Sequence, residues 1–304
     1  MVFNYSIANF DNFCAFLRRI YMNIVDLHVH SNASDGTLSP SELVKEAKKA
    51  GLLAFALTDH DTVSGVPEAI AAGTACGIEV VPGIEISTCY KDKEIHIVGL
   101  FLDYTDKNFV SALGSETDRR KRRNLELVER FNEYGFPANI DEIRSMFPGS
   151  IITRAHFASY MVKKGYVKDN AEAFSKYLGQ GMPLYVPKEL KDPKEAISLI
   201  QTAGGVSVLA HPLLYRLTSG ELRALCSELK SLGLTGIETM YSTYRGFDEL
   251  NVRKLAREFG LLESGGSDFH GANKPHISLG NGCGNLCISA SYMEALRAES
   301  RDFT

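Results

Sequence analysis

Short motifs rich in histidine and carboxylate side chains follow most of the apolar, strand-like runs of this sequence. The neutral histidine nitrogen is the commonest protein ligand for a transition metal, whereas a buried charged histidine is costly. The motifs are Asp26-Leu27-His28-Val29-His30, Thr58-Asp59-His60-Asp61, Gly83-Ile84-Glu85, Ile95-His96-Ile97, Ala210-His211-Pro212 and Ser267-Asp268-Phe269-His270. One His-x-His pair would mean little, but the whole series predicts a multinuclear metal site with hydrolytic chemistry.

The chain alternates apolar runs with amphipathic segments from Asn23 onward. Strands are predicted at 24–29, 53–57, 79–81, 84–87, 94–101, 206–210, 236–240 and 261–264. Repeated strand–helix units predict a parallel sheet covered by helices, and about seven units favour a TIM-like barrel over an open sheet. The motifs then lie where a barrel places its active site, at the carboxyl ends of the strands, except that His96 lies within its strand.

This alternation is interrupted between residues 103 and 191, which predict short helices separated by Gly and Pro turns. We therefore expect a barrel domain made of residues 23–102 and 192–290, with residues 103–191 as a helical insertion. Residues 1–22 have apolar side chains at roughly helical spacing, and we expect them to be an N-terminal extension, either a docking helix or a translated upstream segment. Residues 291–304 are expected to be a C-terminal tail.

The composition limits which binding partners and which cellular location are expected for the protein. The formal charge of −4 gives no global attraction to a DNA duplex or a membrane surface, so anion binding must come from a local field. The six cysteines are scattered and do not resemble a disulfide scaffold; Cys283 and Cys287 lack a second ligand pair for a zinc clip. No run is long enough to span a bilayer, and residues 1–22 lack the features of a signal peptide, so a cytoplasmic protein is expected.

Several of these residues also have an ordinary structural interpretation. His28 and His30, two apart on a strand, point to one face and can bind one ion, yet the pair alone is weak support. Asp35 could be a turn residue before a glycine. Glu85 could be an exposed strand residue, although Pro82-Gly83 before it suggests a kink that turns it inward. His96 between two isoleucines faces either solvent or the barrel lumen.

Taken together and in order, the motifs resemble those of the PHP family, the polymerase and histidinol phosphatase phosphoesterases. The resemblance extends from Ile24 to Leu286 and includes His28-Val29-His30-Ser31-Asn32-Ala33-Ser34-Asp35-Gly36. It implies a distorted (β/α)7 barrel. Ile152-Thr153-Arg154-Ala155-His156-Phe157 and Gly179-Gln180-Gly181 resemble the insertion of the stand-alone members. That subgroup acts on nucleoside 3′,5′-bisphosphates and, in some members, on the 5′ ends of short RNA.

The resemblance also implies a ligand set for two to three divalent ions. One ion would take His28, His30, Glu85 and Asp268, a second Asp35, His60 and His270, and a third Glu85, His96 and His211. A set rich in histidine favours manganese, iron or zinc over magnesium. A hydroxide bridging the ions would attack the phosphorus of a phosphomonoester, with His60, His211 and Asp268 as catalytic residues. Asp59 and Asp61 are expected to orient His60.

Arg154, His156 and Lys188 are the candidates for substrate binding, since the insertion would place them above the barrel mouth. A guanidinium can bind a phosphate through two hydrogen bonds, although Arg154 could equally be a helix-surface charge. Tyr185 is a weaker candidate. The basic run from Arg119 to Arg123 is expected to be a solvated helix face, or a guide for an RNA tail. His276 has no such context and is expected at the surface.

Three other functions compete with a nucleotide phosphatase. An amidohydrolase also begins with His-x-His on a barrel, but it commonly adds a bridging lysine that has no counterpart at a strand end here. A histidinol phosphatase shares the family's site, but an insertion carrying arginine suits a second phosphate better than a cationic amino alcohol. A metal-bearing accessory domain of a polymerase is disfavoured because the ligand set is complete and no polymerase sequence is attached.

Overall fold

The computed structural model describes residues 23–148, 152–187 and 190–301, without the side chains of residues 115–120. Eight strands form one sheet in the order β7-β6-β5-β4-β3-β2-β1-β8. The strands are β1 (Ile24–Val29), β2 (Ala54–Leu57), β3 (Glu79–Tyr90), β4 (Lys93–Leu100), β5 (Val206–Leu209), β6 (Gly236–Tyr241), β7 (Leu262–Gly266) and β8 (Ile288–Ser289).

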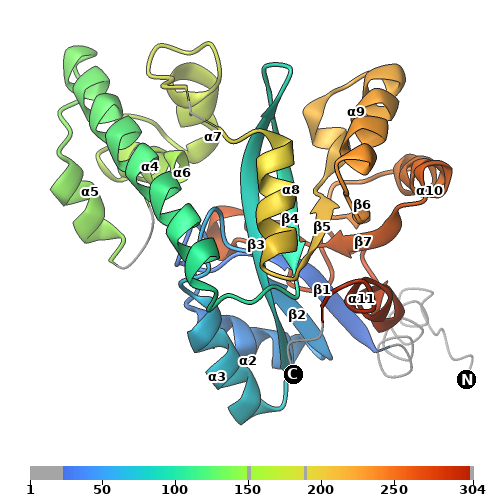
Figure 1. Ribbon diagram of the computed structural model, residues 1–304. Coiled ribbons are helices and arrows are strands. Elements are labelled where there is room, and N and C mark those ends of the chain that lie inside the picture. Colours follow the sequence, from blue (N-terminus) through green and yellow to red (C-terminus); the bar gives the residue numbers. More distant parts are fainter. Residues whose placement is uncertain (1–22, 149–151, 188–189, 302–304) are drawn as a thin grey trace, which may run out of the picture.

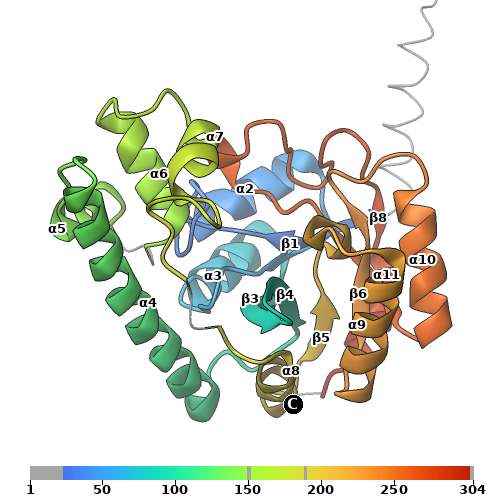
Figure 2. The same cartoon turned by 90° about the horizontal axis from the view of Figure 1, so that it is seen from above.

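The two sides of this sheet meet at the carboxyl ends of β1 and β7. There the amide of His30 donates to the Phe269 carbonyl at 3.0 Å, and the amide of Asp268 donates to the His28 carbonyl at 2.8 Å. The sheet is therefore a nearly closed barrel with helices arranged around it, as Figure 2 shows from above. The predicted TIM-like barrel is confirmed.

The helices that follow the strands cover the outside of the barrel (Figure 1). They are α2 (Pro40–Ala50), α3 (Val66–Cys76), α8 (Pro193–Thr202), α9 (Ser219–Ser231), α10 (Asp248–Phe259) and α11 (Ala290–Arg297), with short 3₁₀ turns at Pro212–Tyr215 and Gly271–Asn273. The predicted start of α2 is confirmed: Ser39 accepts from the Glu42 amide, and the Glu42 side chain accepts from the Ser39 amide. Within the described residues, no helix combines the length and the apolar character that crossing a membrane requires.

The expectation of an all-parallel sheet is wrong at two places. β4 runs antiparallel to both β3 and β5, and β8 runs antiparallel to β1. The reason lies in the link between β3 and β4, where only Lys91 and Asp92 separate the two strands and both have positive φ, of 45° and 64°. A two-residue turn of this kind can join only antiparallel neighbours, whereas a parallel pair needs a long crossover.

The barrel buries apolar side chains on both faces of its strands. On β2, Phe55 and Leu57 pack in a cluster with residues of α2 and α3, while Ala54 and Ala56 belong to a second cluster. Met293 and Leu296 of α11 join that second cluster and are fully buried. Part of the predicted C-terminal tail is therefore a helix that completes the barrel core.

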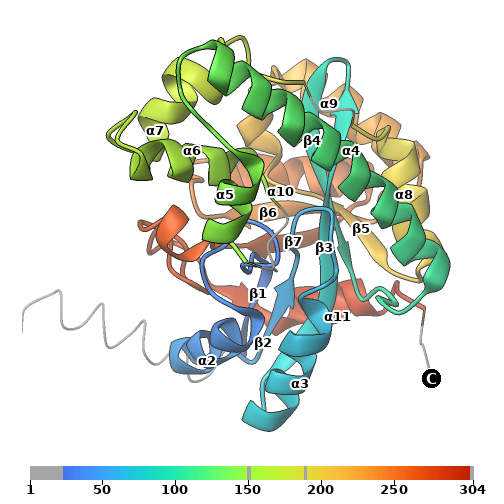
Figure 3. The same cartoon turned by 90° about the vertical axis from the view of Figure 1, so that its left-hand side faces the viewer.

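The inserted helices form a separate layer, which we call the cap and define as the described residues from Lys107 to Pro187. It contains α4 (Lys107–Glu133), α5 (Ile140–Met146), α6 (Arg154–Lys163), α7 (Asn170–Ala173) and a π-helical turn (Phe174–Leu178). These helices bury their own apolar cluster, with Phe131, Phe157 and Tyr160 fully enclosed. Figure 3 shows α5, α6 and α7 grouped together, with the long α4 leading from them across the strands toward α8. The predicted domain boundaries stay a prediction.

Candidate metal centre

Strand β1 brings His28 and His30 to the barrel mouth, where both rings are fully buried. Their Nε2 atoms lie 3.0 Å apart, and Oδ1 of Asp268 lies 3.3 Å from Nε2 of His30. Asp268 reaches this place because β7 runs very close to β1. A Cβ on Gly266 would stand 2.2 Å from Cβ of His28, so only glycine allows the approach. The structure thus brings His28, His30 and Asp268 together.

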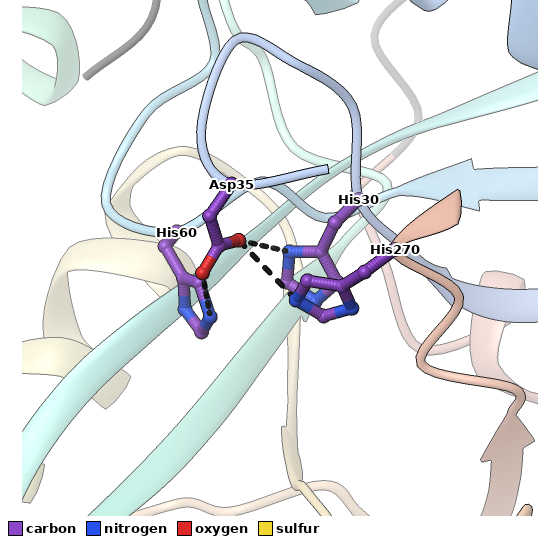
Figure 4. A group of neighbouring side chains, drawn as sticks. All are labelled: His30, Asp35, His60 and His270. Atoms are coloured by element: carbon purple, nitrogen blue, oxygen red, sulfur yellow. Dashed lines mark ion pairs between the residues drawn. The ribbon is translucent and has the colours of Figure 1, made fainter. Parts of the chain in front are cut away.

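A second group forms around Asp35, whose carboxylate lies among three imidazole rings. Oδ1 of Asp35 lies 3.2 Å from Nε2 of His270, and Oδ2 lies 3.8 Å from Nε2 of His60. Figure 4 shows this carboxylate with His60 on one side and with His30 and His270 on the other. Ligand atoms of these four residues all lie within 4.8 Å of one another, which is close enough for one ion.

Hydrogen bonds to the Asp59 carboxylate hold the loop that carries Asp35. This carboxylate accepts hydrogen bonds from the amide of Ser31 at 2.7 Å and from the hydroxyls of Ser31 and Ser34 at 2.6 Å. Burial raises the pKa of Asp59 to about 6, although the bonds from Ser31 and Ser34 oppose this rise. The expected role of Asp59 in orienting His60 receives no support; its hydrogen bonds instead shape the loop that presents Asp35.

Glu85 lies at the middle of the cluster and is 1% exposed. Its Oε1 lies 2.8 Å from Nδ1 of His96 and 2.9 Å from Nε2 of His211, and its Oε2 lies 3.0 Å from Nδ1 of His60. Two further candidate ion positions share this carboxylate, one with His28 and His211 and one with His60 and His96. All nine predicted ligands therefore converge at one end of the barrel.

The chemistry of these side chains suits divalent cations. Nδ1 of His30 and Nδ1 of His211 are buried without a hydrogen-bond partner among the described residues, which is rare for buried polar atoms. Burial and the neighbouring His270 lower the pKa of His30 to about 4, so its ring is neutral and can offer a lone pair. Burial opposes ionisation of Glu85, but His96, His60 and His28 hold the pKa of that carboxyl well below its usual range.

Three residues next to the metal centre were not predicted from the sequence. Glu238 contacts His28 and His211, while Tyr241 and Lys274 both bind Oδ2 of Asp268 at 2.6 Å. One signal was available for Glu238, because a carboxylate interrupts an otherwise apolar strand in Gly236-Ile237-Glu238-Thr239-Met240. Lys274 gave no signal, since it lies in an irregular loop; its neighbour His276 is exposed, as expected.

The cap faces the metal centre through Arg154, at the start of α6. Its guanidinium lies 3.4 Å from Oε2 of Glu94 on β4 and 5.2 Å from the centre of the Tyr185 ring. Oε1 of Glu94 in turn lies 3.3 Å from Nε2 of His96. Arg154 is thus linked through one carboxylate to a predicted metal ligand.

Two adjoining cavities lie on this face. The smaller, of about 180 Å³, is lined by Asp35, His60, Glu94, His96, Thr153, Arg154, Ala155 and Phe174. The larger, of about 470 Å³, is lined by Cys89, Asp92, Glu94, Arg154, Phe174, Gly179, Gln180, Tyr185, Pro187 and Leu190. They share Glu94, Arg154 and Phe174, so Arg154 stands between the histidine cluster and a wider space under the cap.

The structure does not support the other predictions for the cap in the same way. His156 is 2% exposed and is used within the cap: its Nδ1 accepts from the Thr153 amide at 3.0 Å and its ring packs on Phe147. It is not among the described residues that line either cavity, so its predicted substrate contact lacks support. Lys188 lies outside the described residues. In the basic run, Arg123 is buried, so the expected solvated face holds only for Lys121 and Arg122 among the described side chains.

Comparisons with known proteins agree with this arrangement. The PHP domain family matches residues 26–179. A 5′-3′ exoribonuclease of Haemophilus influenzae is 40% identical over 81% of this chain and 89% of its own length. A 3′,5′-nucleoside bisphosphate phosphatase of Chromobacterium violaceum is 34% identical over 81% of this chain and 87% of its own length.

A solved protein structure has a similar fold. That protein is described as an amidohydrolase from Chromobacterium violaceum with bound sulfate and no metal. It superposes with a TM-score of 0.81 at 32% identity, covering 90% of this chain and 96% of that one.

Proposed function

The chain belongs to the PHP domain family of metal-dependent phosphoesterases, and from this premise we propose that it removes the 3′-phosphate from nucleoside 3′,5′-bisphosphates. The observation that carries the proposal is the position of Arg154 between the two cavities. A nucleoside 3′,5′-bisphosphate presents two phosphates on opposite sides of one ribose. One would lie at the histidine cluster, and the other would meet a guanidinium able to bind it through two hydrogen bonds.

The metal centre would hold two to three manganese, iron or zinc ions. We assign His28, His30, Glu85 and Asp268 to the first, Asp35, His60 and His270 to the second, and Glu85, His96 and His211 to the third. Three of the four residues of the first set form one grouping of nearby ligand atoms, and all three residues of the second set form another together with His30. For the third set, Glu85 groups with His211 and His28 in one place and with His96 and His60 in another. When bound, such ions lower the pKa of a bound water toward neutrality and offset the charge on a phosphoryl group.

The protein's own groups perform the remaining tasks. Asp268 is fixed by Tyr241 and Lys274 through Oδ2, which leaves Oδ1 facing His28 and His30. Phe174 and Tyr185 line the wider cavity and provide aromatic faces on which a nucleobase can stack. Gln180 adds an amide that can bind a base edge. These groups favour a nucleotide over a smaller phosphomonoester.

A second candidate activity is removal of nucleotides from the 5′ end of short RNA. Its support is the 470 Å³ cavity beyond Arg154, which extends past the space next to the metal centre. The relatives include both an exoribonuclease and a bisphosphate phosphatase, and both reactions transfer a phosphoryl group to water. One metal centre can therefore serve both substrates, provided that the cap accommodates the longer one.

The test is to load the purified protein with Mn²⁺ or Zn²⁺ and to offer five substrates side by side. These are 3′-phosphoadenosine 5′-phosphate, 3′-AMP, a short 5′-phosphorylated RNA, histidinol phosphate and a panel of amides. We expect phosphate release from the bisphosphate at the highest kcat/KM. Preferred hydrolysis of histidinol phosphate, or of an amide, would replace the proposal with the corresponding alternative.

A further inference from the structure

Glu238, on β6, lies below the metal centre and is 1% exposed. Its two carboxylate oxygens have different partners. Oε1 lies 2.7 Å from Nδ1 of His28, and Oε2 accepts a hydrogen bond from the backbone amide of His211 at 2.6 Å. Both partners are predicted metal ligands, whereas Glu238 is absent from the groups of residues placed to share an ion.

The contact with His28 fixes which ring nitrogen is available to an ion. When Oε1 of Glu238 accepts the hydrogen bond at this contact, Nδ1 of His28 is the nitrogen that carries the proton. Nε2 is then the nitrogen with the free lone pair. It faces the cluster, 3.0 Å from Nε2 of His30 and 3.4 Å from Oε2 of Glu85.

The contact with His211 fixes a backbone conformation that a non-glycine residue rarely adopts. His211 has φ 27° and ψ 55°, with Pro212 directly after it. Positive φ costs free energy in a residue with a side chain and persists where surrounding contacts enforce it. The hydrogen bond from its amide to Glu238 is such a contact, and the conformation places Nε2 of His211 2.9 Å from Oε1 of Glu85.

We propose that Glu238 is a positioning residue of the metal centre, which sets the tautomer of His28 with one oxygen and the backbone of His211 with the other. The inference rests on the proposed metal centre. It does not depend on which phosphoester is the substrate. Carboxylates that orient metal-binding histidines typically change metal affinity by about 10–100-fold when they are replaced.

Replacement of Glu238 by glutamine separates this role from simple packing, because the side chain keeps its size and loses one acceptor. The amide oxygen can serve either His28 or His211, and the NH2 group then faces the other partner. If the oxygen accepts from the His211 amide, the NH2 group requires Nδ1 of His28 to be an acceptor, which moves the ring proton to Nε2. If the amide oxygen instead accepts from Nδ1 of His28, the NH2 group faces the backbone N–H of His211, and two hydrogen-bond donors oppose each other.

The experiment titrates metal-free Glu238→Gln, Glu238→Asp and wild-type protein with Mn²⁺ and with Zn²⁺ by calorimetry, without substrate. We expect Glu238→Gln to bind the metal 10–100-fold more weakly. Glu238→Asp, which keeps two acceptor oxygens, should lose less. The matched control is Glu263→Gln on the neighbouring strand β7, where the carboxylate pairs with Arg253 and Thr239 instead; its metal affinity should equal that of wild type.

Metal affinity of Glu238→Gln within twofold of wild type, or a greater loss in Glu238→Asp than in Glu238→Gln, would overturn the inference. Circular dichroism checks that each variant is folded. If Glu238→Gln does not fold, ¹⁵N NMR of Zn²⁺-loaded wild type still decides: His28 must carry its proton on Nδ1, and a deprotonated Nδ1 refutes the proposal. A wild-type protein that binds neither metal would instead refute the proposed function itself.

Discussion

The metal centre and the cap face of the same site are built in different ways. Seven of the nine predicted ligands are buried, and they come from the barrel strands and from the loops that directly follow them. On the cap face, Arg154 and Tyr185 are half-buried and belong to a segment with an apolar core of its own. The centre is thus fixed by the barrel, while the cap contributes a few side chains from a separately packed layer.

This difference assigns separate tasks to the two regions. A buried cluster in which one carboxylate serves several histidines cannot lose a member without leaving others unpaired. A partly exposed guanidinium can be replaced at lower cost, because water compensates for what is lost. We therefore expect changes at the centre to abolish turnover and changes at the cap to alter which substrate is preferred.

The largest effect should come from removing the metal. Dialysis against a chelator should eliminate phosphate release, and adding back Mn²⁺ or Zn²⁺ should restore it. The chelated protein should also unfold more readily, because a ligand present at 1,000 times its Kd stabilises a fold by about 4 kcal/mol. The measurement is phosphate release combined with thermal unfolding. Full activity after chelation, with metal absent by elemental analysis, would contradict the assigned centre.

The next largest effect should come from single ligands. Asp268→Ala and His60→Ala each remove a donor that faces the cluster. If each variant loses several kcal/mol of transition-state stabilisation, turnover should fall by about a thousandfold or more. The readouts are kcat, metal content and circular dichroism. His276→Ala is the matched control, since His276 is exposed, and it should retain wild-type turnover. Either ligand variant turning over normally would remove that residue from the mechanism.

The contrast between the regions also explains what could be predicted from the sequence. Most of the ligands were predictable because their motifs follow apolar runs whose ends the barrel brings together, and the resemblance to the PHP family supplied the full set, including His96 within its strand. Glu238 and Lys274 could not be placed in this way. Glu238 depends on which face of β6 turns toward the centre, and Lys274 on the path of an irregular loop.

The fold likewise contains features that the sequence predicted and features that it did not. The alternation of strands and helices predicted the barrel, but periodicity carries no strand direction, so the antiparallel β4 was missed although a short polar link precedes it. His156 has the residue type expected of a phosphate ligand, yet the sequence could not show that its ring points into the cap, where it accepts from the Thr153 amide. Local sequence patterns do not predict contacts that depend on how the cap packs within itself and against the barrel.

A smaller effect is expected at Arg154. Arg154→Ala should raise KM for 3′-phosphoadenosine 5′-phosphate by about 10–100-fold, since a hydrogen bond to a charged group contributes about 1.5–3 kcal/mol. Turnover at saturation should change little, because the metal ligands are untouched. The control is 3′-AMP, which lacks the second phosphate and should show the same KM in both proteins. An equal rise for both substrates would mean that Arg154 does not bind the 5′-phosphate.

The smallest effect is expected at Glu94, where the two regions touch. Its Oε2 lies 3.4 Å from Arg154, and its Oε1 lies 3.3 Å from His96, so the carboxylate competes with a substrate phosphate for the guanidinium. A half-exposed ion pair contributes about 0.2–1 kcal/mol, so Glu94→Gln should lower KM for the bisphosphate by no more than about fivefold. Comparing the bisphosphate with 3′-AMP separates the two contacts. A change confined to the bisphosphate shows that Glu94 acts through Arg154, whereas a fall in kcat for both substrates shows that it acts through His96 and belongs with the metal centre.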